Sequence, residues 1–178
     1  MDMREKKIKS NIIYDGKIVR LEKDTVLCPN GKEAFREVIR HNGGAAILYI
    51  NDKDEVLLIK QFRYPYNEII YEIPAGKLEK NENPYDAAMR ELEEETGIKA
   101  KSLEHLIDIY PTCGYSSEII YLYLAKDCTL THTNFDPDEF IEIEYIPLNK
   151  VKEMILNGKL KDGKAICAIS TYLMKYNK

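Results

Sequence analysis

An acidic segment bounded by turn signals, GKLEKNENPYDAAMRELEEETGI at residues 76–98, constrains this chain more than any other feature. Asn83 and Pro84 predict a helix that begins near Pro84, because asparagine can bond the unpaired N–H groups of a first turn and proline has no N–H to lose there. Gly97 can adopt the left-handed conformation that ends a helix, so we expect the helix to end near Thr96.

The carboxylates of Glu91, Glu94 and Glu95 are spaced so that they share one face of this helix. A charge run on a helix is usually just a solvated face. Like charges at this spacing repel by roughly a few tenths of a kcal/mol per pair, however, and a bound divalent cation would offset that cost. Hard oxygen ligands suit Mg²⁺ or Mn²⁺ held together with water and substrate phosphate. The cluster therefore predicts a metal site for a phosphate-bearing substrate.

The same segment resembles the Nudix box, a long pattern of glycine, glutamate and arginine positions with fixed spacing. Every fixed position of the pattern is matched, by Gly76, Glu82, Arg90, Glu91, Leu92, Glu94, Glu95, Gly97 and Ile98. A pattern of this length is far more specific than a short glycine motif. The resemblance identifies the chain as a member of the Nudix hydrolase family. It implies an enzyme that cleaves pyrophosphate bonds with the help of cations, which neutralise the pyrophosphate and activate water.

The resemblance also assigns roles within and beside the box. It implies that Mg²⁺, with Mn²⁺ as a substitute, is held by Glu91, Glu94, Glu95 and the main-chain carbonyl of Ala75. Arg90 and Glu94 take catalytic roles, with Arg90 fixing the orientation of the box glutamates. Glu82 braces the loop or contacts metal indirectly. Gly76 serves where the backbone needs special dihedral angles or a close approach.

Segments outside the box resemble the ADP-ribose pyrophosphatase branch of the family. They are RHNGGAAIL at 40–48, QFRYPYNEIIYEIPAGKLE at 61–79 and the proline in YPTCGYSSE at 110–118. Thr112 and Cys113 depart from the Ser-Pro-Gly sequence that is typical of this branch after the box. The branch implies hydrolysis of ADP-ribose to AMP and ribose 5-phosphate. Other nucleotide sugars, NADH or FAD are alternative substrates, and a non-catalytic ADP-ribose sensor is disfavoured because the box glutamates are all present.

Three residues are candidates for binding this substrate. By the same resemblance, Arg63 and Glu72 contact the nucleotide and Arg36 reaches substrate phosphate. Guanidinium presents a fork to phosphate, and a carboxylate can accept bonds from an adenine amino group or ribose hydroxyls. The alternative for Arg36 is a solvated arginine on a strand. Tyr14 either stacks on adenine or simply packs.

The general base is expected outside the box, since glutamates that are engaged with cations are poor proton acceptors. In the ADP-ribose branch this glutamate lies on a loop before a late strand, which corresponds here to THTNFDPDEFIEIEYIPL at 131–148. Glu139 is the best candidate because Pro137 marks the loop. Glu118 and Glu142 are the alternatives, and Glu139 could also be one more solvated acid in a polar turn.

The rest of the chain predicts an α+β protein with mixed β-sheets sandwiched between helices in an α/β/α arrangement, as the Nudix fold implies. Residues 11–43 alternate β-rich runs with the turns YDGK and CPNGK, which predicts an antiparallel three-stranded unit. Later apolar or alternating runs, including EIIYEIPAG at 68–76, predict core strands, and two helices are expected near 149–157 and 163–176. We expect an N-terminal β unit over 1–42 and a catalytic domain over 43–178.

Composition and charge limit the kinds of molecule that this protein is expected to bind. The acidic balance argues against nonspecific nucleic-acid binding. The absence of a long apolar run and of a signal-like start predicts a cytoplasmic protein without a membrane partner. The scattered cysteines favour reduced thiols. The family resemblance implies a homodimer that exchanges its N-terminal units, so that Arg36 completes the site of the partner subunit.

Overall fold

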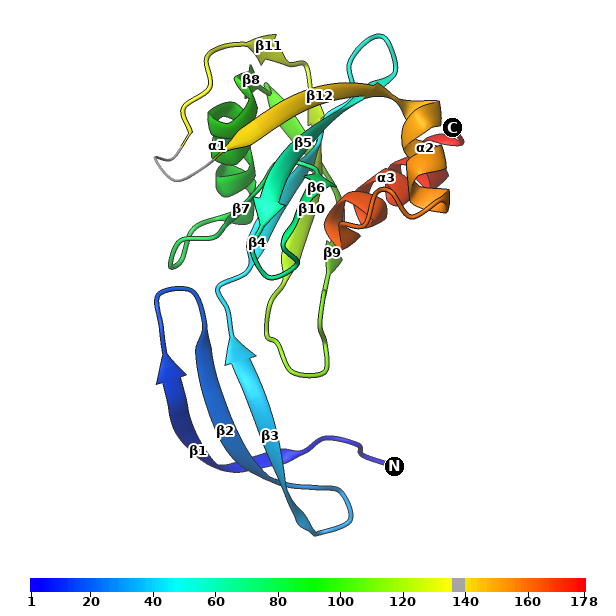
Figure 1. Ribbon diagram of the computed structural model, residues 1–178. Helices are drawn as coiled ribbons and strands as arrows, with labels where there is room; N and C mark the ends of the chain where they lie inside the picture. The colour runs from blue at the N-terminus through cyan, green and yellow to red at the C-terminus, as the bar shows by residue number, and fades with distance from the viewer. Residues whose placement is uncertain (136–139) are drawn as a thin grey trace. The chain divides into compact units, whose positions relative to one another are not determined.

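In a computed structural model, which describes residues 1–135 and 140–178, the chain forms two compact units. The first comprises Met1–Gly43 and Tyr110–Ile119, and the second comprises Gly44–Ile109 and Ile120–Lys178. The first unit contains an antiparallel sheet of β1 (Lys6–Asp15), β2 (Arg20–Leu27) and β3 (Glu33–Arg40), in that order (Figure 1). The predicted N-terminal three-stranded unit is confirmed, and Gly31, with φ of 78°, lies in the turn between β2 and β3.

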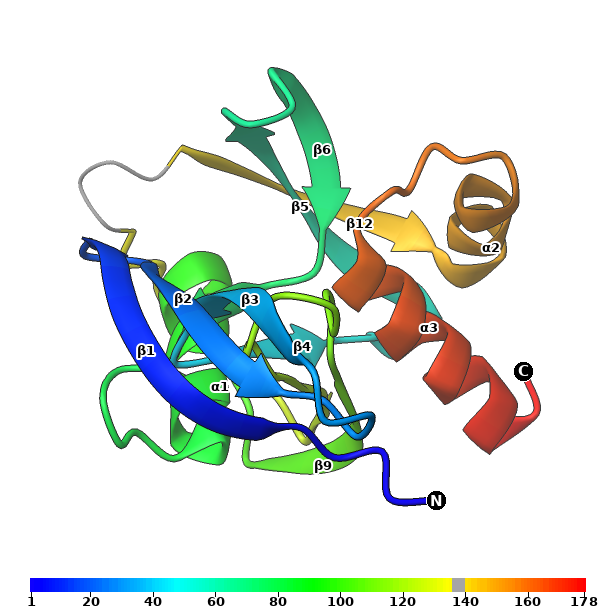
Figure 2. The same ribbon diagram turned by 90° about the horizontal axis from the view of Figure 1, so that it is seen from below.

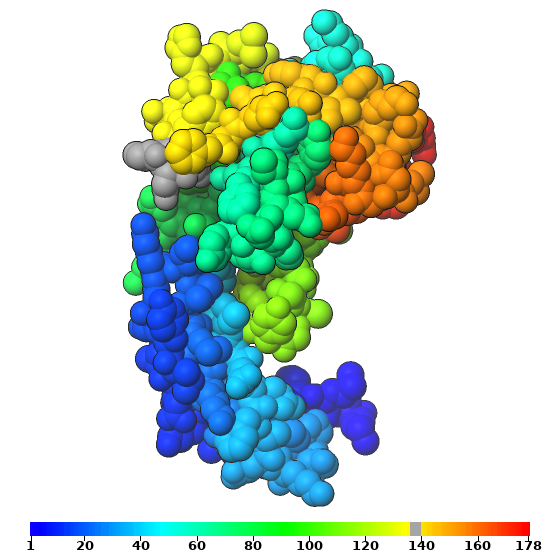
Figure 3. All heavy atoms as spheres, viewed as in Figure 1, coloured from blue at the N-terminus to red at the C-terminus, as the bar shows by residue number. Residues whose placement is uncertain are grey.

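Segment 110–119 is attached to the end of β3 within the first unit. Ile39 N donates to the carbonyl of Tyr115 at 2.8 Å, and Ser117 N donates back to the carbonyl of Ile39 at 2.9 Å. By contrast, every residue of β1 is exposed, and the dark-blue atoms of this strand lie at the surface in Figure 3. This small sheet therefore buries little of its apolar side-chain surface by itself.

The second unit is built on two sheets. The first has the order β7-β4-β10-β9 and the second has the order β12-β5-β6. Their strands are β4 (Gly44–Leu48), β5 (Glu55–Arg63), β6 (Glu68–Glu72), β7 (Ala75–Lys77), β9 (Ser102–Ile109), β10 (Ile120–Lys126) and β12 (Ile141–Pro147). A short pair of β8 (Ile98–Lys99) and β11 (Thr129–Leu130) completes the unit. Because β4 and β10 are parallel while their other neighbours are antiparallel, the larger sheet is mixed, as predicted.

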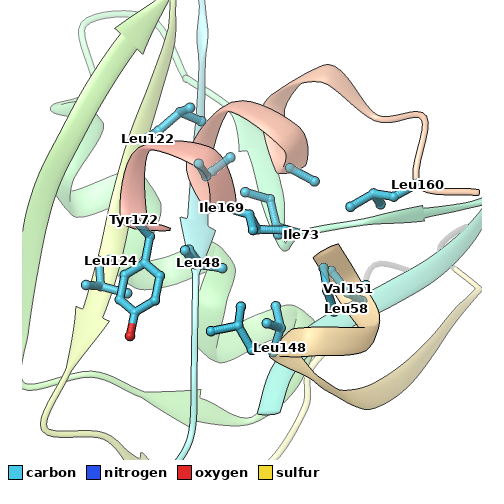
Figure 4. Packing of buried hydrophobic residues seen from close by; sticks show 14 of the residues in the cluster. Leu48, Leu58, Ile73, Leu122, Leu124, Leu148, Val151, Leu160, Ile169 and Tyr172 are labelled. Atoms are coloured by element: carbon cyan, nitrogen blue, oxygen red, sulfur yellow. The ribbon is translucent and has the colours of Figure 1, made fainter. Parts of the chain in front are cut away.

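Each face of the larger sheet carries its own hydrophobic core. Alternate residues of a strand point to opposite faces, so Ala46 and Leu48 of β4 pack in one core while Ala45 and Ile47 pack in the other. The first core is closed by α2 (Leu148–Leu156) and α3 (Gly163–Tyr176), and Figure 4 shows its side chains converging. The second is closed by α1 (Pro84–Thr96), and α1 and α3 lie on opposite sides of β4 (Figure 2).

The helix boundaries follow from local caps. Asn83 Oδ1 accepts from Tyr85 N at 2.9 Å at the start of α1. Gly97 ends the helix with φ of 65°, and its N–H donates to the carbonyl of Glu93. Both predicted ends of α1 are confirmed. The last two helices also agree with the predicted ranges, with α2 displaced by one residue from 149–157.

One predicted strand is divided in two. The run EIIYEIPAG forms β6 and β7, which belong to different sheets, with Ile73 and Pro74 between them. Proline has no N–H for a sheet ladder, so the chain can leave one sheet and enter the other at this point. The division brings residues 75–77 beside α1. Among the described residues, no helix combines the length and the apolar character needed to cross a bilayer.

Candidate active site

The acidic face of α1 lies against β7. Glu95 is buried, and its Oε2 accepts a hydrogen bond from Ala75 N at 3.0 Å. Glu91 lies one turn earlier, next to Gly76. A Cβ at Gly76 would lie 1.9 Å from the carboxyl carbon of Glu91, closer than any real contact. Gly76 does not have a positive φ, so close approach of the carboxylate is the reason that this position needs glycine.

Arg90 joins three carboxylates of the box. Its Nη1 donates to Glu91 Oε1 at 2.8 Å and to Glu94 Oε2 at 2.9 Å. Its Nε and Nη2 donate to Glu82 Oε1 at 3.3 and 3.2 Å. Partial burial alone would lower the pKa of Arg90, but these carboxylates more than offset it and raise the pKa. Arg90 therefore holds Glu91 and Glu94 through Nη1, and Glu82 through the Nε–Nη2 edge of its planar guanidinium.

Glu82 also stabilises the loop that precedes α1. Its Oε2 accepts from Glu79 N at 2.8 Å while its Oε1 binds Arg90. This is the bracing contact expected from the sequence, and it ties residues 79–82 to the helix. The loop, β7 and α1 are thus connected by side chains of the box itself.

A cleft of about 360 Å³ lies beside this carboxylate cluster. It is lined by Arg90, Glu93, Glu94, His132 and Asn134. The segment that forms its other side is bonded to the end of α1, with Thr131 N donating to the carbonyl of Gly97 at 2.7 Å and Asn134 N to the carbonyl of Glu94 at 2.8 Å. The described part of the loop that precedes β12 is therefore fastened to the box helix.

The oxygen-rich composition of the cluster fits a hard divalent cation. Carboxylate and carbonyl oxygens are the preferred ligands of such cations. Over residues 1–135 and 140–178, no three acidic, histidine or cysteine side chains converge as a complete ligand set. Arg90 occupies positions on Glu91 and Glu94 that a metal would share. A cation would thus compete with one guanidinium for oxygens that already lie together.

The second predicted pair, Arg63 and Glu72, is also assembled. Glu72 is buried at the end of β6, and both of its oxygens accept from Arg63, with Nη2 to Oε2 at 2.7 Å. Lys164 of α3 binds the same carboxylate. Burial alone would raise the pKa of Glu72, but hydrogen bonds and charges from Arg63 and Lys164 outweigh it and lower the pKa. The hydrogen bond to Glu72 is the main cause that raises the pKa of Arg63, and the charges of Asp162 and Glu95 add to it.

The remaining predicted residues make contacts outside these two groups where the structure describes them. Arg36 lies in the first unit, where its Nε donates to Glu5 at 3.0 Å, and Glu118 in the same unit lies 3.6 Å from His41 Nδ1. Glu142 is exposed and accepts from Lys60 at 3.2 Å. Tyr14 is exposed at the end of β1. Glu139 lies outside the described residues.

Sequence reasoning missed two charged residues that the fold brings to Glu72. Lys164 binds Glu72, and Asp162 accepts from Lys164 at 3.0 Å while capping α3 through Ala165 N at 3.1 Å. The cap has a local signal, because Asp162 precedes an apolar helical pattern. The Lys164 contact has none, because its partner is 92 positions away in the sequence.

Comparisons with known proteins agree with the resemblance of the box. The NUDIX domain model matches residues 40–168. The chain is 38% identical to a methanol dehydrogenase activator of Bacillus methanolicus, over 93% of this chain and 90% of that protein. It is 37% identical to the ADP-ribose pyrophosphatase of Bacillus subtilis, over 97% of this chain and 95% of that protein.

A solved structure of an ADP compounds hydrolase has the same fold, with a TM-score of 0.85 over 99% of this chain and 98% of that one at 18% identity. Fold, box geometry and relatives agree, and the family model covers well over half of the 178 residues. The chain belongs to the NUDIX domain family.

Proposed function

We propose that this protein is a Mg²⁺-dependent hydrolase that splits ADP-ribose into AMP and ribose 5-phosphate. The observation that carries the proposal is the carboxylate cluster around Arg90, in which a missing Cβ at Gly76 admits the Glu91 carboxylate. The 37% identity to an ADP-ribose pyrophosphatase over nearly the whole chain supports the choice of substrate.

The residues of the box would divide the work of holding the cation and fixing its ligands. Glu91, Glu94, Glu95 and the carbonyl of Ala75 would hold Mg²⁺, which neutralises the pyrophosphate and activates water when bound. Arg90 keeps the Glu91 and Glu94 oxygens in register. The Ala75 N–H does the same for Glu95, which is buried and so has few alternative positions. Holding ligands before the cation arrives reduces the ordering that catalysis must otherwise supply.

Glu139 is proposed as the general base that takes a proton from the attacking water. The described chain on both sides of it supports this choice. Asn134 is bonded to Glu94 of α1, and Ile141 begins β12, paired with Gln61 of β5. The segment from Asn134 to Ile141, which contains Glu139, is therefore bonded to the box helix at its first residue.

Release of AMP from ADP-ribose by the purified protein, with and without Mg²⁺, tests the proposal. A panel that adds other nucleotide sugars, NADH and FAD, ranked by kcat/KM, identifies the preferred substrate. A sensor would bind ADP-ribose without releasing AMP. No Mg²⁺-dependent release from any panel member would refute the hydrolase assignment.

A second candidate function comes from the Bacillus methanolicus relative, whose name describes an activator of methanol dehydrogenase. The 38% identity over 93% of this chain favours testing it. Adding the protein to a methanol dehydrogenase assay, with the Glu95→Gln variant in parallel, would show whether activation occurs and whether it needs the box.

We also propose that the protein works as a homodimer through its N-terminal β unit, residues 1–42. The support is the strand β1, of which every residue is exposed, with Ile8, Ile12 and Ile13 among the exposed apolar side chains. Small sheets are marginal without something to pack against. A second copy would supply that surface, and Arg36 would then reach the site of the partner subunit.

A further inference from the structure

Lys164 is a mostly buried cation at a helix end where the helix dipole disfavours positive charge. It stands in the first turn of α3, and its side chain is only 12% exposed. The N-terminus of a helix carries partial positive charge, so a cation there is unfavourable while an anion is favourable. The first turn of α3 contains no acidic residue, and the carboxylates that Lys164 contacts come from the cap Asp162 and from Glu72 of β6. A neutral side chain would suit the helix better than this lysine.

The lysine shares its carboxylate partner with Arg63. Lys164 Nζ donates to Glu72 Oε2, the oxygen that also accepts from Arg63 Nη2 at 2.7 Å. A second bond runs from Lys164 to Asp162 at 3.0 Å. Arg63 is 38% exposed, whereas the Glu72 side chain is 2% exposed. The cluster therefore has a mostly buried part, formed by Glu72, Lys164 and Asp162, and Arg63 is its more exposed member.

Stability alone does not account for this arrangement. Glu72 already receives two hydrogen bonds from Arg63, so Lys164 is not needed to satisfy the carboxylate. Ordering a lysine side chain is entropically costly, and buried ion pairs are often no better for stability than apolar residues of similar volume. Lys164 changes the electrostatic environment of Arg63. Both cations bind the one Glu72 carboxylate, so its negative charge neutralises Arg63 less completely.

We propose that Lys164 is a positioning residue for nucleotide binding. By sharing Glu72, it fixes the carboxylate from the buried side and leaves the exposed guanidinium of Arg63 with positive charge to offer an anionic ligand. Arg63 uses Nε and Nη2 for Glu72, and its Nη1 has no partner in the described part of the chain. The inference rests on the proposed function for its nucleotide substrate, and on the sequence prediction that Arg63 and Glu72 contact the nucleotide.

The test is Lys164→Met, which keeps a long unbranched side chain and removes the charge. KM for ADP-ribose should rise by about tenfold or more, the scale of a lost charged hydrogen bond, while kcat stays close to wild type. AMP binding measured by calorimetry without metal should weaken by a similar factor. The matched control is Lys161→Met. Lys161 pairs with Glu68 of the same β6 strand at 2.8 Å, but both are more than half exposed, so KM and AMP binding should not change.

A second variant separates positioning from simple loss of the network. Asparagine caps helices as well as aspartate does, so Asp162→Asn keeps the cap of α3 and removes only the negative charge beside Lys164. Lys164 then neutralises Glu72 more completely, and KM should stay at or below the wild-type value. A KM increase in Asp162→Asn that matches the increase in Lys164→Met would overturn the proposal.

An unchanged KM and unchanged AMP binding in Lys164→Met would also overturn it. Failure of the proposed function looks different, because the wild-type protein itself would then not cleave ADP-ribose. In that case the same KM ratios are measured on the panel substrate that the wild type cleaves best.

Discussion

Glu95 is the box carboxylate whose proposed role as a cation ligand is easiest to test, because a main-chain hydrogen bond fixes its position. It is 3% exposed and accepts from Ala75 N. In Glu95→Gln the amide oxygen can still accept that bond, so the thermal midpoint should change little. Loss of the charge removes a proposed cation ligand, and turnover at ordinary Mg²⁺ should fall by orders of magnitude, with a similar loss for Glu91→Gln.

Asp86→Asn is the control for this prediction, because it makes the same acid-to-amide change at an exposed residue in the first turn of α1. Its turnover should equal wild type. Both variants are measured over a range of Mg²⁺ concentrations. Wild-type turnover in Glu95→Gln would exclude Glu95 as a ligand.

The choice of Glu139 as general base gives a second prediction for single residues. Glu139→Gln should lower kcat by roughly 10²-fold or more, the usual scale for a general base, with little change in KM or in the Mg²⁺ requirement. The comparison variants are Glu118→Gln and Glu142→Gln, which change the alternative bases. Steady-state kinetics of all three decides between them: near-normal kcat in Glu139→Gln with a large loss in either alternative would transfer the role.

For single residues, the sequence predicted those contacts that lie within one continuous motif. The spacing of Glu82, Arg90 and Gly76 is fixed by a loop, a helix and a strand that follow one another directly, so the pattern carries the geometry. The contacts of Lys164 with Glu72 depend instead on how α3 packs beside β6. Nothing near Lys164 in the sequence records that packing.

The C-terminal end of α3 is attached to β9 through the carboxylate of Glu104. Glu104 accepts from Tyr176 Oη at 2.6 Å, and Lys175 and Lys126 lie 2.5 and 3.3 Å away. The hydrogen bond from Lys175 is the largest of the effects that lower the pKa of Glu104 to about 2. A folded-state pKa below the unfolded value stabilises the protein above the unfolded pKa, and this stabilisation is lost as pH falls through the folded pKa.

Glu104→Gln should therefore lower the urea midpoint at pH 7, and its difference from wild type should shrink between about pH 4.5 and about pH 2. Unfolding curves over this pH range check the prediction. Glu153→Gln, in an exposed pair with Lys150 on α2, should change the midpoint much less because both partners are screened by solvent. Equal effects of the two variants at pH 7 would contradict the role of the Glu104 cluster.

Elements were predicted best where their limits depend on local chemistry. Asn83 and Gly97 fix the ends of α1 through bonds to neighbouring residues, so the predicted range agrees with the structure. The order of strands in the sheets could not be predicted from the sequence, because the parallel pairing of β4 with β10 joins segments that are distant in sequence. The division at Pro74 was missed for the same reason, since it depends on which sheet each half joins.

The N-terminal unit leaves several large apolar side chains exposed. Ile8, Ile12, Ile13 and Phe35 are all at least half exposed. Scattered apolar residues are normal on a surface, but here they gather on one small sheet. Burying them against a second copy would stabilise the unit through the hydrophobic effect.

We therefore predict that light scattering at micromolar concentration gives twice the mass of the chain. Ile12→Lys places a charge on β1 and should shift the protein toward monomer, with activity falling in parallel because each site would lose the Arg36 of the partner subunit. Leu156→Lys is the matched control, since Leu156 is an 88% exposed apolar residue at the end of α2 in the second unit. It should remain dimeric and active. A wild-type monomer with full activity would rule out both the dimer and the shared site, because a complete site would then exist within one chain.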